Sequence, residues 1–102
     1  MYEPTDENEL NELLKNNKFV LLYFYATWCN PCKQLSSDIE KYRSENTELC
    51  VVKINVDTTG DLYETYNISS LPTLKLFINN VEKIGLVGYK ESHISTIKSF
   101  LQ

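Results

Sequence analysis

Cys29 and Cys32 are the residues whose type and spacing most directly indicate chemistry, because they enclose only Asn30 and Pro31. Two cysteines at this spacing can form and break a disulfide with each other, and a turn between a strand and a helix should leave the first sulfur projecting freely. Disulfide exchange requires a thiolate, whereas an ordinary thiol with a pKa of about 8.5 is only about 3% ionised at neutral pH. The motif therefore predicts Cys29 as an activated nucleophile and Cys32 as the thiol that resolves its mixed disulfide.

A zinc site is the main alternative use of a cysteine pair, since structural zinc takes four cysteine or histidine ligands. The chain has three cysteines and one histidine, so Cys50 and His93 would have to complete the set. Cys50 alternates with apolar residues in a strand-like run, which is typical of a small core residue, and His93 fits a polar residue in the first turn of a helix. We therefore expect redox chemistry and no metal.

Hydrophobic periodicity predicts the elements that would position the cysteine pair. Thr5 and Asp6 can cap a first helix that ends near residues 16–17, and residues 18–26 are almost continuously apolar, which predicts a strand buried on both faces. Pro31 suits the first turn of the helix that follows the cysteines. The remaining predicted elements are a strand over 49–56, a short helix over 61–66, strands over 73–78 and 81–87, and a closing helix with the apolar stripe Ile94, Ile97, Phe100 and Leu101.

The order of these elements predicts an α/β fold in which helices cover both faces of a central mixed sheet. The strands on either side of the cysteine-bearing helix form a βαβ unit and should be parallel, with a right-handed crossover. The last two strands are joined by Asn79 and Asn80, which tolerate the left-handed conformations of a tight hairpin, so they form an antiparallel ββα unit with the closing helix. A chain of 102 residues should bury one modest core, so we expect a single domain over residues 1–102.

Composition argues against several classes of function. The net charge is -4 and no cluster of Lys or Arg interrupts the acidity, so we expect no binding to nucleic acid. The longest apolar run is far shorter than the roughly 20 residues that span a bilayer, so we expect no membrane segment. The first residues lack the basic start and apolar stretch of a secretory signal, which favours a cytoplasmic protein; the alternative is a leader removed ahead of Met1.

The segment Trp28-Cys29-Asn30-Pro31-Cys32-Lys33, in this order of elements, resembles the active-site segment of the thioredoxin family. The resemblance covers essentially the whole chain. Leu71-Pro72-Thr73 looks like the family's cis-proline loop, Lys53 falls on its central-strand lysine, and Gly88 falls on its late glycine. The resemblance thus implies the thioredoxin fold, in which the Leu71–Pro72 peptide bond would be cis and would lie against the cysteine pair.

The same resemblance implies a function, namely reduction of protein disulfides through a redox-active Cys29–Cys32 disulfide. Family members bind no cofactor, use NADPH indirectly through a thioredoxin reductase, and are usually monomers. Their partners are therefore the reductase and disulfide-containing protein substrates. The positions that match the family's substrate-binding surroundings are Trp28, Asn30, Pro31, Leu71, Pro72 and Gly88, with Lys53 as a candidate for proton transfer or electrostatic support.

Two departures from the family pattern affect these expectations. Asn30 stands where the family most often has glycine, and the residues between the cysteines tune the reduction potential. Tyr23 stands where typical members carry a buried carboxylate that is thought to help proton transfer at the second cysteine. Because a buried tyrosine is a poor base at neutral pH, we expect Cys32 to lose its proton through water, with Lys53 nearby, and to attack more slowly than usual.

Two other functions compete with a reductase. A thioredoxin-like domain can serve as a non-catalytic binding or scaffold module, whose groove around Trp28, Leu71 and Pro72 grips a partner. An oxidant or isomerase relative would use the same cysteines at a higher potential, although such relatives often carry histidine between proline and cysteine. Retention of both thiols and the absence of that histidine favour a reductase.

Overall fold

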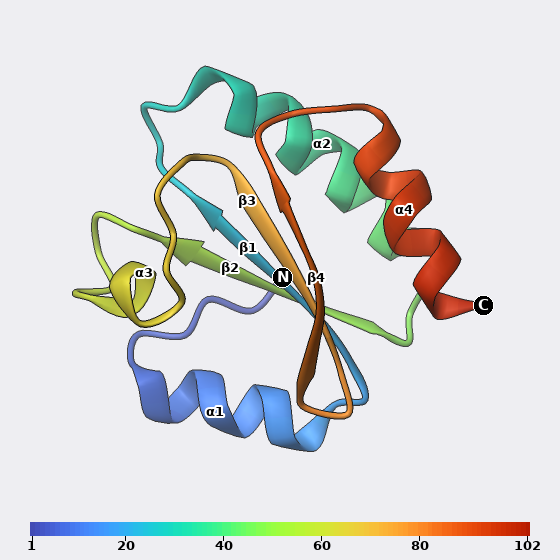
Figure 1. The fold of residues 1–102 in the computed structure, drawn as a ribbon, viewed down its shortest axis with the longest axis horizontal. Coiled ribbons are helices and arrows are strands. Elements are labelled where there is room, and N and C mark those ends of the chain that lie inside the picture. The colour runs from blue at the N-terminus through green and yellow to red at the C-terminus, as the bar shows by residue number, and fades with distance from the viewer.

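A central four-stranded mixed sheet with helices on both faces organises the fold (Figure 1). The structure is a computed structural model that describes residues 1–102. The thioredoxin-type architecture predicted from the order of elements is confirmed, and every expected helix and strand is present. The elements are α1 (Glu7–Asn16), β1 (Phe19–Tyr25), α2 (Asn30–Glu45), β2 (Leu49–Asn55), α3 (Leu62–Thr65), β3 (Thr73–Ile78), β4 (Val81–Val87) and α4 (Ser92–Leu101).

The strand order is β2-β1-β3-β4, which combines the two predicted units in one sheet. β1 and β2 are parallel, whereas β1 pairs antiparallel with β3, and β3 antiparallel with β4. In the parallel pair Tyr25 lies opposite Asn55, so both strands end at the same edge of the sheet. The loops that follow β1 and β2 therefore leave the sheet side by side, and the first of them leads to the cysteine pair at the start of α2.

β1 is buried on both faces, as its continuous apolar sequence predicts. Leu21 and Tyr23 belong to a core cluster with residues of α2 and α4. Leu22 and Phe24 belong to a second cluster with residues of α1 and α3 on the opposite face. Alternate side chains of a strand point to opposite faces, so this one strand contributes to both core clusters. Its burial also fixes the start of the segment that leads from β1 to Cys29.

The N-terminal helix begins where its capping residues predict. The Asp6 side chain accepts a hydrogen bond from the Glu9 backbone N–H at 2.9 Å, and Leu10 and Leu14 are buried against the sheet. A contact that the sequence did not indicate lies just before this helix. Tyr2 forms a parallel bridge to Val52, which covers part of the free edge of β2.

The β3–β4 hairpin has the turn that its two asparagines predict. Asn79 and Asn80 have φ values of 51° and 64°, both in the left-handed region that a two-residue hairpin turn requires. Asparagine tolerates this region better than other residues with a side chain. The local sequence therefore fixes the register of the two strands next to the turn.

The apolar stripe predicted for α4 is partly wrong. Ile97 is fully buried, but Phe100 is exposed, and His93 takes the buried position one turn before Ile97. Each helical residue turns about 100°, so Phe100 lies about 60° to one side of Ile97, whereas Ile94 and Leu101 lie on its other side. His93 lies about 40° from Ile97 on the Phe100 side, so the buried face ends between His93 and Phe100. No helix in the structure has both the length and the apolar character needed to cross a membrane.

Candidate active site

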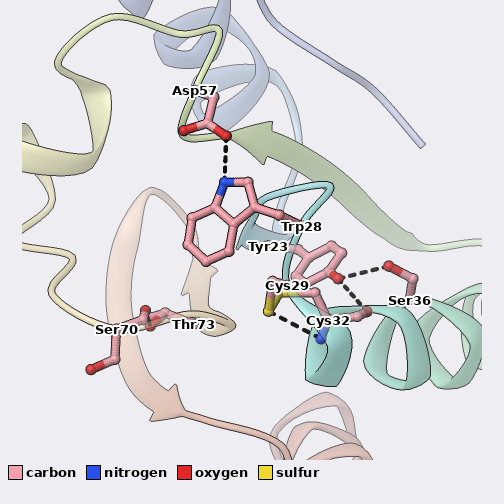
Figure 2. Close-up of a disulfide and its surroundings, with 8 residues drawn as sticks. All are labelled: Tyr23, Trp28, Cys29, Cys32, Ser36, Asp57, Ser70 and Thr73. Atoms are coloured by element: carbon pink, nitrogen blue, oxygen red, sulfur yellow. Dashed lines mark hydrogen bonds between the residues drawn. A yellow bond between two sulfur atoms is a disulfide. The ribbon is translucent and has the colours of Figure 1, made fainter.

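The cysteine pair lies at the start of α2, directly after the loop that follows β1 (Figure 2). Cys29 and Cys32 form a disulfide, with their Cα atoms 5.3 Å apart. Cys29 is the N-cap residue of α2: its backbone is extended, and its Sγ accepts a hydrogen bond from the Cys32 backbone N–H at 3.2 Å. Pro31 falls in the first turn, where its missing N–H leaves no helical hydrogen bond unmade.

The two cysteines differ in access, although both are largely covered. Cys29 is 6% exposed and Cys32 is 2% exposed. The expectation that the first sulfur projects freely from the turn is therefore wrong, because the Cys29 Sγ points back to cap the helix. Only Cys29 contributes to the wall of the adjacent groove, so an incoming disulfide would meet Cys29 first.

The same capping geometry can stabilise a thiolate on Cys29 once the disulfide is reduced. Lowering a thiol pKa from about 8.5 to about 7 requires about 2 kcal/mol of preferential stabilisation of the thiolate. The partial positive charge at a helix N-terminus typically supplies about 0.3–1 kcal/mol. A hydrogen bond from the Cys32 backbone N–H to the ionised sulfur adds to this, since hydrogen bonds to charged groups contribute about 1.5–3 kcal/mol.

A groove of about 600 Å³ lies beside Cys29. Four of the residues expected to bind substrate line it: Trp28, Asn30, Pro31 and Leu71. Other lining residues escaped the sequence analysis and come from the loop after β2, from α3 and from the segment before Leu71. They are Val56, Asp57, Tyr63, Ile68, Ser69 and Ser70.

Trp28 lines this groove and is 68% exposed, so its indole is accessible to a substrate. Its Nε1–H donates a hydrogen bond to Asp57 Oδ2 at 2.8 Å, which orients the indole over the groove (Figure 2). Asp57 follows β2, and Trp28 follows β1. Because the two strands are parallel neighbours, their C-terminal loops meet, and this is the signal in the sequence that could have paired these two residues.

Pro72 and Gly88 were expected at the substrate site but do not line the groove. The Leu71–Pro72 peptide bond is cis, as the resemblance implied. The Gly88 backbone N–H donates to the Pro72 carbonyl at 2.8 Å, and Gly88 has a φ of 78°, which favours glycine. Thr73 Oγ1 donates to the Ser70 carbonyl at 2.7 Å, so the loop that carries Leu71 is fixed from both sides.

Lys53 lies on β2, with Tyr23 of β1 as its register partner. Its Nζ is 4.7 Å from the centroid of the Tyr25 ring, a cation–π contact. The structure contains no hydrogen bond between Lys53 and either active-site cysteine. Because Tyr23 packs in the same cluster as Cys29 and Cys32, Lys53 lies on the cysteine side of the sheet, but its ammonium group faces Tyr25.

Tyr23 is fully buried behind the cysteine pair. Its hydroxyl lies 2.7 Å from the Cys32 carbonyl oxygen and 2.6 Å from Ser36 Oγ (Figure 2). Burial raises the pKa of the Tyr23 hydroxyl above its ordinary value, and the Ser36 hydrogen bond opposes this only in part. Tyr23 is therefore a neutral hydroxyl throughout the physiological pH range.

The residues that a zinc site would need are far from forming one. Cys50 packs in the cluster on the α1 and α3 face of the sheet, whereas Cys29 and Cys32 pack on the α2 and α4 face. His93 is buried and its Nε2 lies 3.0 Å from the Gly88 carbonyl oxygen, so this nitrogen carries the proton and donates. No group of three or more His, Cys, Asp or Glu side chains is arranged to hold a metal ion.

Alkylation of the reduced protein should distinguish Cys29 from Cys50. Burial raises the pKa of the Cys50 thiol, so less thiolate is present at any pH below that raised value. We expect iodoacetamide at neutral pH to modify Cys29 rapidly and Cys50 at least about tenfold more slowly than an unfolded thiol. Peptide mass spectrometry after timed quenching measures both rates, and protein unfolded in urea is the control. Equal rates at the two cysteines in the folded protein would contradict this account.

Comparison with known proteins agrees with the fold and the site. The family model described as Thioredoxin matches residues 2–102. Thioredoxin of Mycoplasma genitalium is 41% identical over 81 residues, which is 79% of each chain, and Thioredoxin-1 of Saccharomyces cerevisiae is 37% identical over 81 residues, again 79% of each chain. A solved structure of Plasmodium falciparum thioredoxin superposes with a TM-score of 0.91 at 28% identity and covers 98% of this chain and 99% of that chain.

Proposed function

Because the chain belongs to the thioredoxin family and is a thiol-disulfide oxidoreductase, we propose that Cys29 is its nucleophile and Cys32 its resolving thiol. The observation that carries this assignment is the unequal access of the two sulfurs. Cys29 lines the groove, and Cys32 lies behind it in the first turn of α2. A substrate disulfide can therefore reach Cys29 while Cys32 stays covered.

The reaction begins with reduced protein. The Cys29 thiolate attacks one sulfur of the substrate disulfide, a Cys29–substrate disulfide forms, and the substrate bond breaks with its electron pair leaving on the second substrate sulfur as a thiolate. Cys32 loses its proton to solvent and attacks the Cys29 sulfur. The Cys29–Cys32 disulfide forms, the mixed disulfide breaks, and the first substrate sulfur leaves as a thiolate that takes a proton from water. The substrate gains two electrons, and the cysteine pair loses two.

The groove supplies the substrate contacts in this proposal. Trp28 and Leu71 offer it apolar surface, and Asn30 and Pro31 line it next to the reacting sulfur in the chain. Pro72 acts indirectly, by fixing the direction of the chain next to Leu71, and Gly88 supports Pro72 through its backbone hydrogen bond. Lys53 contributes electrostatically, through its place on the cysteine side of β2.

The proposed partners follow from the family. Thioredoxins act on disulfide-containing substrates and are reduced by a partner reductase; we assign to this chain a thioredoxin reductase that uses NADPH, and protein disulfides as substrates. The chain acts as a single domain, as a monomer and in the cytoplasm. The net charge of -4 supports the exclusion of nucleic acid from the set of partners.

A coupled turnover assay tests this proposal. The protein is mixed with NADPH, thioredoxin reductase and a protein that has an accessible disulfide, and NADPH oxidation is followed by absorbance. We expect oxidation that requires all three proteins and many turnovers per molecule. If protein reduced with dithiothreitol works but the reductase cannot regenerate it, the assigned reductase is wrong. If even the reduced protein leaves the substrate disulfide intact, the enzyme assignment fails and a binding module replaces it.

A further inference from the structure

The Tyr23 hydroxyl is a buried polar group that the reaction described above does not use. Tyr23 comes from the middle of β1, and its ring stacks on that of Tyr25, with centroids 5.3 Å apart. Its hydroxyl passes beneath the first turn of α2 and meets Cys32 and Ser36 (Figure 2). The side chain thus connects the central strand to the residue that must perform the second step of the reaction.

The directions of the two hydrogen bonds are fixed by elementary chemistry. A carbonyl oxygen can only accept, so the single Tyr23 hydroxyl proton points to the Cys32 carbonyl. The Tyr23 oxygen must then accept from Ser36, whose hydroxyl supplies the other proton. The raised pKa of Tyr23 agrees with this arrangement, because only the protonated hydroxyl can donate to the carbonyl.

Both backbone polar groups of Cys32 are therefore engaged. Its N–H donates to Cys29 Sγ at 3.2 Å, and its carbonyl accepts from Tyr23 at 2.7 Å. The N–H contact depends on the state of Cys29, which changes its bonding in every step of the cycle. The Tyr23 contact does not involve a reacting atom, so it can hold Cys32 in the same place throughout.

We propose that Tyr23, supported by Ser36, is a positioning residue that holds Cys32 in place for its attack on the mixed disulfide at Cys29. The inference rests on the proposed function and deepens it, because it concerns the resolving step alone. Tyr23 does not take the Cys32 proton; it restricts the backbone that carries the Cys32 thiol. The attack of Cys29 on the substrate does not use the Cys32 thiol, so the restriction acts chiefly on the second step.

The variant Tyr23→Phe removes the hydroxyl and keeps the ring. A net hydrogen bond of ordinary strength corresponds to about a two- to tenfold change, so we expect resolution of the mixed disulfide to slow about two- to tenfold. Ser36→Ala should slow it less, because the bond from Tyr23 to Cys32 remains. Because Ser36 acts through Tyr23, the double variant should be no slower than Tyr23→Phe alone.

Tyr25→Phe is the matched control. Tyr25 lies on the same strand, stacks on the same ring and also has a hydroxyl hydrogen bond, but to Glu3 at 3.2 Å rather than to the cysteine loop. This variant removes one hydroxyl from one tyrosine without altering Cys32. We expect it to resolve the mixed disulfide at the wild-type rate.

A single-turnover experiment separates the two steps. Reduced protein is mixed with excess peptide disulfide, quenched with acid at short times, and the free, mixed-disulfide and oxidised forms are counted by mass spectrometry. We expect a longer-lived mixed disulfide in Tyr23→Phe and a smaller change in the rate at which it forms. Wild-type lifetimes in both Tyr23→Phe and Ser36→Ala would overturn the inference, as would equal slowing by Tyr25→Phe. If wild type forms neither a mixed disulfide nor the Cys29–Cys32 disulfide, the proposed function fails instead.

Discussion

Replacing Cys29 with serine should abolish disulfide reduction, whereas replacing Cys32 with serine should leave a mixed disulfide that accumulates. Serine keeps the size of the side chain but cannot form a disulfide, so Cys29→Ser removes the nucleophile. Loss of a nucleophile costs far more than loss of a binding contact, and we expect the rate to fall by at least about 1,000-fold. Cys32→Ser retains the first step, because Cys29 still lines the groove and still sits at the N-terminus of α2.

The two variants are distinguished by whether they carry a covalent mixed disulfide with the substrate after exposure to it. Non-reducing electrophoresis and mass spectrometry should show a stable adduct with Cys32→Ser and none with Cys29→Ser. Cys50→Ala is the control, since Cys50 is a free thiol buried on the opposite face of the sheet, and it should behave as wild type. Trapping by Cys29→Ser and not by Cys32→Ser would reverse the assigned roles.

Phe24→Ala should strongly destabilise the folded protein. Phe24 is fully buried in the central strand, and its ring lies 5.8 Å from that of Tyr66, which in turn meets Phe77 edge-on at 6.2 Å. Removing a buried phenylalanine leaves a cavity and costs about 3–5 kcal/mol, a large part of the free energy of unfolding of a domain of this size. Urea denaturation measures this loss of unfolding free energy as a lower midpoint. The slope of the unfolding free energy against urea concentration should stay unchanged.

Phe100→Ala is the matched control for this prediction. It makes the same chemical change on α4, where the side chain is exposed. Substitutions at exposed positions usually change the free energy of unfolding by less than about 0.5 kcal/mol. A cost at Phe100 as large as that at Phe24 would contradict the burial described for the two faces of the fold.

Local sequence predicted the elements because their signals are local. The unbroken apolar run of β1, the capping residue Asp6 and the pair Asn79-Asn80 each specify a conformation through their own side chains. The order of elements then allowed very few topologies. The reactive pair was predicted for the same reason, since its motif lies within four consecutive residues.

The contacts that shape the site could not be predicted in this way, because they depend on register and side-chain direction. Asp57 meets Trp28 across 29 positions of sequence, and Ser36 meets Tyr23 across 13. The low exposure of Cys29 depends on a sulfur that turns back toward its own helix. A pattern of residue types specifies neither the register of the strands nor the direction of a side chain.

The reduction potential of the Cys29–Cys32 couple tests the central claim most directly. The protein is equilibrated with dithiothreitol buffers of graded ratio, with glutathione buffers as a second series, and free thiols are counted after acid quench and alkylation. A reductant of protein disulfides should have a potential near about -270 mV, and this is the value we predict. A potential of about -180 mV or higher would make the pair an oxidant or isomerase, and would contradict the reductive function.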